Sequence, residues 1–285
     1  RQRLINILEH QAEFINSTHR HTGLVGGFRS GKSQAGVFKT IAKKLQLPGV
    51  DVAYYLPTYP LIKDIAFQKF TEALTDNNIP FTLNRTDKDI ITPYGRIIMR
   101  SMDNPDLIVG YEVGYSLVDE ADVLPKVKMQ EVMLKILARN SVHSAGNNNA
   151  TDFVSTPEGY RFLHEFFVKN ANKDKLLIKA STRNNPFISE SYIESLEAEY
   201  NAQQLAAYLD GEFVNLTAGS VYCDYDRNAN NTDRVIKQGD ILHIGIDFNV
   251  TKMSAVVHVT ENGIDYAVDE ILNEYDTRSI SELIK

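Results

Sequence analysis

The sequence contains a single cysteine, no apolar run long enough to cross a membrane, and no excess of positive charge. Because Cys223 has no second cysteine to pair with, an internal disulfide is excluded and a reducing compartment is favoured. No apolar stretch is close to the length of a membrane span, which is about 18 residues, and no secretory signal is visible. The net charge of −7 gives no whole-chain sign of nucleic-acid binding. The 285 residues, 43% of them hydrophobic, therefore predict a soluble intracellular protein, of about two domains.

A glycine-rich octet, residues 26–33, reads Gly-Gly-Phe-Arg-Ser-Gly-Lys-Ser and matches the P-loop pattern G-x-x-x-x-G-K-[ST]. In this pattern backbone N–H groups point at phosphate oxygens, the lysine reaches the β- and γ-phosphates, and the final hydroxyl binds Mg²⁺. An apolar stretch precedes the octet and helical apolar spacing follows it over residues 34–45. The alternative is a glycine turn with an accidental lysine. We predict an ATP site formed by Gly26, Gly27, Phe28, Arg29, Ser30, Gly31, Lys32 and Ser33, with Mg²⁺ on Ser33.

An apolar run from Tyr115 to Val118 ends in two carboxylates, Asp119 and Glu120. A buried parallel strand has such a run, and its C-terminal end lies beside the phosphate site of a P-loop protein. We therefore expect Asp119 to hold Mg²⁺ and Glu120 to act as the general base that polarises the attacking water. The alternative is a strand that ends in two solvated acids.

Predicted strands and helices alternate through the first two thirds of the chain. Strands are predicted over 52–56, 153–156 and 176–180, a helix over 61–74, and a hairpin over 90–101. Such alternation predicts an α/β fold with a mostly parallel sheet and helices on both faces. Three more strands, 243–248, 253–260 and 264–271, follow near the C-terminal end.

Five further segments, in order along the chain, are typical of one protein family. They are His10-Gln11, residues 110–122 around the acidic pair, Ser155-Thr156-Pro157-Glu158-Gly159, residues 181–186 (Ser-Thr-Arg-Asn-Asn-Pro) and residues 208–214 (Tyr-Leu-Asp-Gly-Glu-Phe-Val). With the P-loop, this ordered set resembles the large terminase subunit of tailed bacteriophages, the ATP-driven DNA-packaging motor. The resemblance implies a RecA/ASCE-like P-loop ATPase domain over 1–215 and the N-terminal part of a ribonuclease-H-like nuclease domain over 216–285.

The resemblance also implies roles for residues outside the P-loop. Gln11 would contact adenine, and Ser155 and Thr156 would belong to the motif that couples hydrolysis to motion. From the residues alone, their hydroxyls could face the γ-phosphate or the attacking water, and an ordinary strand-ending turn is the alternative. The implied partners are double-stranded DNA, the portal protein, the small terminase subunit and further copies of the chain in a ring on the procapsid. The implied location is the host cell cytoplasm, with no membrane partner.

Hydrolysis usually needs an arginine that stabilises charge on the transferred phosphoryl group. Arg29, inside the P-loop, is the candidate in the same chain. Many relatives carry an arginine just before the residue that corresponds to Gly110, where this chain has Val109. Arg100 and Arg139 are possible substitutes, although a surface salt bridge is the alternative role for each.

Asp247 lies in the first of the three C-terminal strands and, by the resemblance, is the first metal-binding carboxylate of a two-metal nuclease site that takes Mg²⁺ or Mn²⁺. Asp269 and Glu270 are candidates for a position near it, but we interpret both as ordinary strand-end acids. A capping box at residues 279–282 predicts a helix that begins at about Ser279. The nuclease domain is therefore expected to be incomplete and inactive in this chain.

Two other functions compete with this interpretation. A P-loop DNA helicase or translocase would use the same ATP site, but the three strands with Asp247 argue against it. A non-catalytic nucleotide-binding switch would bind ATP without turnover, and Glu120 would then be structural.

Overall fold

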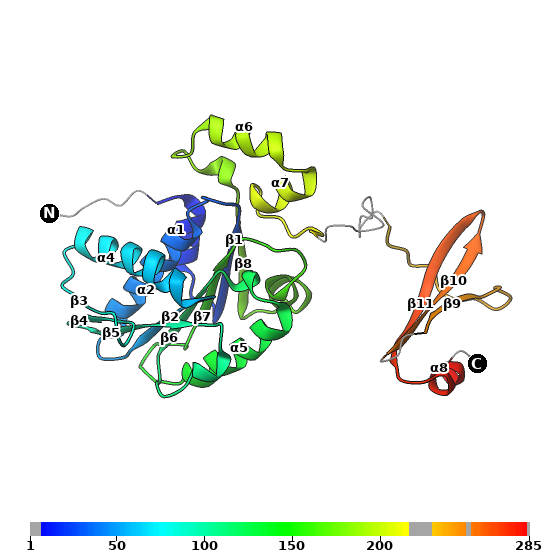
Figure 1. Ribbon diagram of the computed structural model, residues 1–285, viewed down its shortest axis with the longest axis horizontal. Coiled ribbons are helices and arrows are strands. Elements are labelled where there is room, and N and C mark those ends of the chain that lie inside the picture. Colours follow the sequence, from blue (N-terminus) through cyan, green and yellow to red (C-terminus); the bar gives the residue numbers. More distant parts are fainter. Residues whose placement is uncertain (1–6, 217–229, 249–251, 284–285) are drawn as a thin grey trace. The chain divides into compact units, whose positions relative to one another are not determined.

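The computed structural model describes residues 7–216, 230–248 and 252–283, so Cys223 lies outside the described residues. The chain divides into two units, residues 1–218 and 219–285 (Figure 1). Each unit has its own sheet. None of the described helices is both long and apolar enough to cross a bilayer.

The first unit is built on an eight-stranded sheet with the order β3-β4-β5-β2-β6-β7-β1-β8. Six neighbouring strands, from β5 to β8 in this order, pair in parallel, and β4 is antiparallel to both of its neighbours, β3 and β5. This confirms the predicted mostly parallel α/β sheet, and the predicted hairpin is β4 with β5. The strands are β1 (His21–Gly26), β2 (Val52–Leu56), β3 (Thr82–Asn84), β4 (Asp89–Thr92), β5 (Gly95–Ser101), β6 (Tyr115–Asp119), β7 (Thr151–Ser155) and β8 (Lys175–Ala180).

Helices cover both faces of this sheet, as predicted (Figure 1). Helices α1 (Glu9–Asn16), α2 (Lys32–Gln46) and α4 (Phe67–Asp76) enclose one core with side chains such as Phe14, Leu24 and Tyr54. Helix α5 (Lys126–Arg139) and the π-helical turn η4 (His164–Lys169) enclose the other core with Val25 and Phe153. Strands β2, β6 and β7 are buried along their whole length, because a parallel sheet is covered on both faces.

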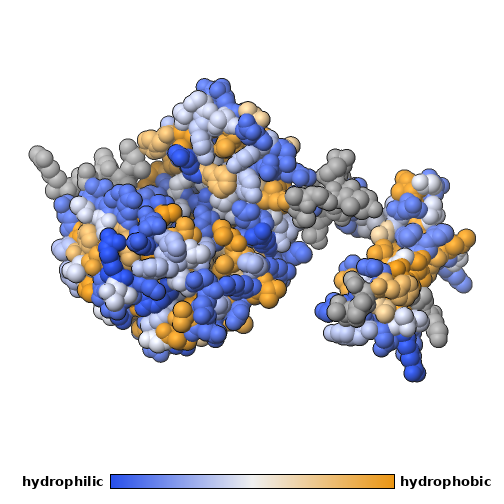
Figure 2. Space-filling model, in the orientation of Figure 1, coloured by the Kyte–Doolittle hydropathy of each residue, from blue (hydrophilic) through white to orange (hydrophobic). Residues whose placement is uncertain are grey.

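Shorter elements connect these layers. The α3 turn (Tyr59–Leu61) and the π-helical turn η1 (Ile62–Ala66) lead into α4, and the 3₁₀ turn η3 (Ala121–Val123) follows β6. The 3₁₀ turn η2 (Pro105–Leu107) follows β5. After β8 come η5 (Thr182–Asn184), α6 (Glu190–Glu199) and α7 (Ala202–Tyr208). On the face drawn in Figure 2, hydrophilic side chains predominate on this unit and hydrophobic ones lie in small groups among them.

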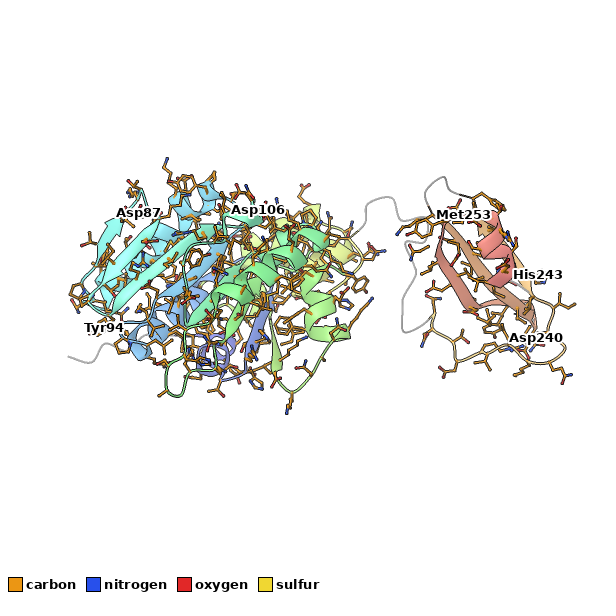
Figure 3. All side chains as sticks on the ribbon, turned by 90° about the horizontal axis from the view of Figure 1, so that it is seen from below. Asp87, Tyr94, Asp106, Asp240, His243 and Met253 are labelled. Atoms are coloured by element: carbon orange, nitrogen blue, oxygen red, sulfur yellow. The ribbon has the colours of Figure 1, made fainter. Side chains whose placement is uncertain are left out.

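The second unit is a three-stranded antiparallel sheet with the order β11-β10-β9. Its strands are β9 (His243–Asp247), β10 (Met253–Glu261) and β11 (Ile264–Glu274). His243 and Met253, the first residues of the antiparallel β9 and β10, lie at opposite ends of the sheet (Figure 3). The turn between β10 and β11 uses positive φ at Asn262 (54°) and Gly263 (78°), as an Asn-Gly hairpin requires.

Helix α8 (Thr277–Leu283) begins two residues before the predicted start at Ser279. Asp276 caps it, because its Oδ1 accepts hydrogen bonds from the backbone N–H groups of Arg278 (2.9 Å) and Ser279 (2.8 Å). The Ser279 hydroxyl instead donates to the Asp276 carbonyl, at 3.0 Å. The prediction of Ser279 as the N-cap residue was therefore wrong. Aspartate is an equally good N-cap residue, and Asp276 lies three positions earlier.

Candidate nucleotide site

The P-loop lies between the C-terminal end of β1 and the first turn of α2, the position that its chemistry requires. Gly31 has φ of +90°, which a residue with a Cβ rarely adopts. Arg29 also has a left-handed backbone, with φ of 58°. Strands β6, β7 and β1 are consecutive and parallel in the sheet. The acidic pair after β6 and Ser155 of β7 therefore lie at the same C-terminal end of the sheet as the P-loop.

A cavity of about 450 Å³ opens beside this loop. It brings together predicted residues from two distant motifs, Glu120 from the end of β6 and five positions of the P-loop. Three residues outside every motif complete it: Gln34, Lys69 of α4 and Tyr192 of α6. The lining residues are Phe28, Arg29, Gly31, Lys32, Ser33, Gln34, Lys69, Glu120 and Tyr192.

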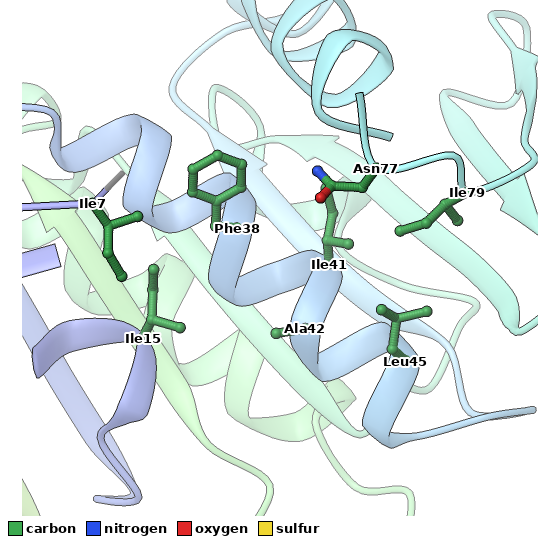
Figure 4. A pocket seen from close by; sticks show the side chains of 8 residues that line it. All are labelled: Ile7, Ile15, Phe38, Ile41, Ala42, Leu45, Asn77 and Ile79. Carbon is green, nitrogen blue, oxygen red and sulfur yellow. The ribbon is translucent and has the colours of Figure 1, made fainter. Parts of the chain in front are cut away.

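A second cavity of about 450 Å³ lies between α1 and α2 (Figure 4). Its side chains are apolar apart from one amide: Ile7, Ile15, Phe38, Ile41, Ala42, Leu45, Asn77 and Ile79. It has no charged group that could bind a phosphate. The P-loop cavity is therefore the one that suits a nucleotide.

Lys32 is held inside the loop that it belongs to. Its Nζ donates to the Gly27 carbonyl at 3.0 Å, and only 5% of the residue is exposed. Burial lowers the pKa of Lys32, while the negative charges of Glu120 and Asp119 oppose that shift. A phosphate that enters the cavity would offer the ammonium group a charged acceptor in place of a carbonyl.

Asp119 and Ser33 supply oxygen ligands suited to a magnesium ion. The Ser33 hydroxyl donates to Asp119 Oδ1 at 3.3 Å, and the Tyr54 hydroxyl donates to the other carboxylate oxygen at 2.6 Å. Burial and the neighbouring Glu120 charge raise the pKa of Asp119 to about 6. Hydroxyl and carboxylate oxygens are the ligands that Mg²⁺ prefers, so this pair fits the ion.

Glu120 follows β6 in a left-handed conformation, with φ of 57°. Its N–H donates to the Val154 carbonyl at 2.8 Å, and its Oε2 lies 3.5 Å from the Thr156 nitrogen. For a residue with a Cβ this conformation costs about 1–2 kcal/mol, and such strain is typical of functional sites. The carboxylate is thereby turned into the cavity, where the general base is expected.

Ser155 and Thr156 are buried at the end of β7 and do not line the cavity. The Ser155 hydroxyl donates to the Thr156 carbonyl (3.0 Å) and accepts from the backbone N–H of Asp122 (3.2 Å). Asp122 Oδ1 in turn accepts from the Leu163 N–H at 2.9 Å. Burial raises the pKa of Asp122 to about 7. The two predicted residues therefore connect the turn after Glu120 with the segment that follows β7.

Two segments from the end of the first unit hold the N-terminal half of the P-loop. The Tyr208 carbonyl accepts from the Phe28 N–H at 2.7 Å, and the Thr182 hydroxyl donates to the Phe28 carbonyl at 2.6 Å. The rings of Phe28 and Tyr208 are stacked, with centroids 4.8 Å apart. A Cβ added to Gly211 would lie 2.7 Å from the Gly26 Cα. Both segments belong to the set that resembles the terminases, but their contact with the loop was not predicted.

Helix α1 holds the C-terminal half of the loop. The Gln11 side-chain amide donates to the Gly31 carbonyl at 2.8 Å and accepts from the Leu8 N–H at 2.9 Å. His10 Nε2 lies 2.8 Å from the Ser30 carbonyl oxygen. Gln11 is buried and does not line the cavity, so its contact with adenine stays a prediction.

Of the three candidate arginines, only Arg29 lines the cavity. Its guanidinium lies over the Tyr192 ring, 4.9 Å from the centroid. Arg100 instead pairs with Asp89 at 3.1 Å and stacks on Tyr111. Arg139 ends α5, on the opposite face of the sheet from α2.

Asp247 ends β9 and is exposed. It pairs with Ser254, and Glu270 of β11 pairs with Val256, so the two acids lie on one face with β10 between them. Asp269 pairs with Val257, which faces the other side. Within the described residues no group of three or more His, Cys, Asp or Glu could hold a metal ion. Asp247 as a metal ligand stays a prediction.

The sequence matches a family model over residues 24–227, and that family is described as "Terminase large subunit, T4likevirus-type, N-terminal". No curated protein sequence matches the chain.

Solved structures with a similar fold include the large terminase of a thermophilic bacteriophage. It is 16% identical over 97% of this chain and 72% of that one, with a TM-score of 0.63. The same protein in complex with ATP-γ-S is 15% identical over 97% and 72% of the two chains, with a TM-score of 0.59. The large terminase ATPase domain of Thermus phage P74-26 is 20% identical over 73% of this chain and 94% of that one, with a TM-score of 0.58. At these identities the likeness shows the shared fold.

Proposed function

The chain belongs to the family of terminase large subunits, and from that membership we propose that it hydrolyses ATP to drive packaging of viral double-stranded DNA. One observation supports the ATPase most directly. Lys32, Ser33 and Glu120 line a single cavity, and Ser33 is hydrogen-bonded to Asp119. These are the cation, the metal ligands and the base that phosphoryl transfer to water requires.

Each group has a separate role in the proposed reaction. Lys32 and the backbone N–H groups of the loop bind the β- and γ-phosphates. Ser33 and Asp119 would hold Mg²⁺, which neutralises charge on the phosphates when bound. Glu120 accepts a proton from the water that attacks the γ-phosphorus.

Loss of the γ-phosphate would be transmitted through the segment after β7. Its Thr156 nitrogen lies 3.5 Å from Glu120 Oε2, so a movement of the base is felt at the start of this segment. Further along, Glu158 Oε2 accepts from the Tyr208 hydroxyl at 3.3 Å. Tyr208 also stacks on Phe28 of the P-loop. Residues 156–158 thus contact the acidic pair directly and are linked to the P-loop through Tyr208.

The remaining roles follow from the family. We propose that the protein acts in the host cell cytoplasm as a ring on the procapsid, with the portal protein and the small terminase subunit as partners. The second unit would be the start of a ribonuclease-H-like nuclease domain, which the three antiparallel strands and Asp247 support.

The decisive test is the Lys32→Ala variant. Turnover of ATP should fall by about 100-fold or more, because phosphate charge loses its main cation. The melting temperature should change little, since Lys32 makes one hydrogen bond to a neighbouring carbonyl. Steady-state hydrolysis and thermal melting of the variant and the parent would be compared.

Near-parental turnover in Lys32→Ala would refute the P-loop assignment. A parent that binds ATP without measurable single-turnover hydrolysis would instead favour the nucleotide-binding switch. DNA unwinding without packaging would favour a helicase.

A further inference from the structure

A second lysine lies in the phosphate cavity, outside every motif of the sequence. Lys69 of α4 lines this cavity with Lys32, Ser33 and Glu120. Its positive charge is close enough to lower the pKa of both Asp119 and Lys32. Within the part of the chain that the structure describes, no hydrogen bond or ion pair of Lys69 is found. Its three N–H donors are therefore available to a ligand.

Packing fixes helix α4 relative to the acidic pair. Phe70, next to Lys69 in the sequence, is fully buried and packs edge-on against the Tyr54 ring, with centroids 5.0 Å apart. The hydroxyl of that same tyrosine donates to Asp119 Oδ2 at 2.6 Å. The contacts from Phe70 through Tyr54 to Asp119 thus fix the backbone of α4 at Lys69 relative to the proposed magnesium ligand. A functional group on a helix that is packed in this way is placed more precisely than one on a loop.

The helix is also irregular just before this position. The five residues of η1 (Ile62–Ala66) form a π-helical turn that runs directly into α4. A π-turn changes which side chains of the following helix face inward, and such turns are common at functional sites. This irregularity is consistent with a helix that is rotated so that Lys69 lines the cavity.

The cavity is lined by two other cations besides Lys69. Lys32 is assigned to the β- and γ-phosphates, and the Arg29 guanidinium lies over the Tyr192 ring. Phosphoryl transfer spreads negative charge over three oxygens of the γ-phosphoryl group, so that one lysine does not reach all of them. We propose that Lys69 contacts the γ-phosphate of bound ATP and stabilises the charge that develops on it during hydrolysis. This inference rests on the proposed ATPase function.

In this step the water oxygen bonds to the γ-phosphorus, and the bond from that phosphorus to the bridging oxygen breaks. ADP leaves with the electron pair of the broken bond, and Glu120 takes the proton of the water. Lys69 keeps its protons throughout and acts by charge and hydrogen bonds. ADP has no γ-phosphate, so the contact should distinguish ATP from ADP.

The test compares Lys69→Ala with the parent and with Lys63→Ala. Lys63 is exposed on η1 in the same irregular helix and does not line the cavity, so it is the matched control. Calorimetry would give the affinities for ADP and for ATP-γ-S with Mg²⁺, and steady-state assays would give kcat and KM for ATP.

In Lys69→Ala we expect ATP-γ-S affinity to fall about tenfold and ADP affinity to change less than about twofold. The kcat should fall about 100-fold, the size seen when one preorganised donor to a transition state is removed. Lys69→Arg should recover part of the kcat, and Lys63→Ala should match the parent. Retained ADP binding shows that the variant is folded.

An unchanged kcat in Lys69→Ala, or an equal loss of ADP and ATP-γ-S affinity, would overturn the inference. If the parent still hydrolyses ATP, the proposed function is unaffected by that result. A parent that binds neither nucleotide overturns the proposed function and this inference together.

Discussion

At the scale of single residues, the cavity is marked by backbone conformations and pKa values that ordinary strand ends lack. Arg29 and Glu120 both have left-handed backbones, with φ of 58° and 57°. The pKa of Asp119 is raised to about 6, chiefly by burial. Neighbouring acids in such different environments are expected to have different roles.

Substitution of each acid by its amide separates these roles. Glu120→Gln should bind ATP with Mg²⁺ like the parent but hydrolyse it about 100-fold more slowly, because the proton acceptor is lost. Asp119→Asn should instead weaken Mg²⁺-dependent binding about tenfold, because a metal ligand becomes neutral. Nucleotide titrations and turnover assays measure both effects. Exchanged phenotypes would show that the two roles have been assigned in the wrong order.

Asp122 should make stability depend on pH. Burial raises its pKa from 3.8 to about 7, so the folded protein binds a proton that the unfolded chain releases. Stability from this group is therefore present below the unfolded pKa of 3.8 and is lost as the pH rises through about 7. Asp122→Asn keeps an acceptor for the Leu163 N–H but cannot ionise. Its free energy of unfolding relative to the parent should increase by about 2 kcal/mol from pH 5 to pH 8.

Urea unfolding of Asp122→Asn and the parent at both pH values measures that difference. A difference that is the same at pH 5 and pH 8 would mean that the carboxyl group ionises equally in the folded and unfolded chains.

The site residues that could be predicted from the sequence are those that lie next to one another in a motif. The P-loop and the acidic pair are local patterns, and their chemistry follows from residue type and spacing. Lys69, Tyr192 and Tyr54 were not predicted, because each reaches the site through tertiary packing of its own helix or strand. A half-buried lysine in a helix and a buried tyrosine in a strand carry no local sign of such a role.

At the scale of elements, glycines fit the P-loop against the segments that hold it. Gly211 has φ of +73°, and its Cα faces Gly26 of the loop. A side chain there would push the segment away from the loop, since its Cβ would lie 2.7 Å from the Gly26 Cα. The two elements can meet at this distance only without that atom.

Gly211→Ala should therefore lower the free energy of unfolding by more than the strain of a positive φ alone would. Gly146 is the matched control, because its φ is +74° and nothing lies within 4 Å of an added Cβ. We expect Gly146→Ala to lower the free energy of unfolding by about 1 kcal/mol and Gly211→Ala by about 3 kcal/mol. ADP affinity should fall only in Gly211→Ala. Equal effects of the two variants on stability and ADP binding would show that the contact with Gly26 does not matter.

Elements were predicted well where the spacing of apolar residues and the flanking turn residues indicate the same boundaries. Examples are β2 and the hairpin turn at Asn262 and Gly263. Helix α8 begins two residues before the predicted start, because two residues that can cap a helix, Asp276 and Ser279, lie within one turn of each other. The π-helical turns were not predicted either, since their hydrogen bonds depend on packing around the helix. Asp87 lies in the turn between β3 and β4, and Tyr94 lies in the turn between β4 and β5 (Figure 3).

At the scale of the whole molecule, alternation of strands and helices was enough to predict the α/β class. It did not give the order β2-β6-β7-β1, because the order depends on crossovers between strands far apart in the chain. The nuclease role of the second unit remains a prediction, as do the proposed partners.

Judged by its described residues, the chain is predicted not to cut DNA. A two-metal nuclease needs several carboxylates around cations about 3.5–4 Å apart, and no group of three metal-binding side chains occurs among the described residues. Supercoiled plasmid incubated with the chain and Mn²⁺ should stay intact on a gel. Nicking that disappears in Asp247→Ala would place an active nuclease centre in this unit.

The hydrogen bonds that hold the P-loop also have a consequence for biosynthesis. Thr182 and Asn185 bind loop carbonyls 154 and 156 positions earlier in the chain. A ribosome adds about 5–20 residues per second, so roughly 10–30 s pass between synthesis of the loop and synthesis of the residues that hold it. During that interval the carbonyls of Phe28 and Arg29 lack these partners, so we expect cellular ATP to stabilise the nascent chain by binding only after residue 185 has been made. Until then the early chain depends on its own core for stability.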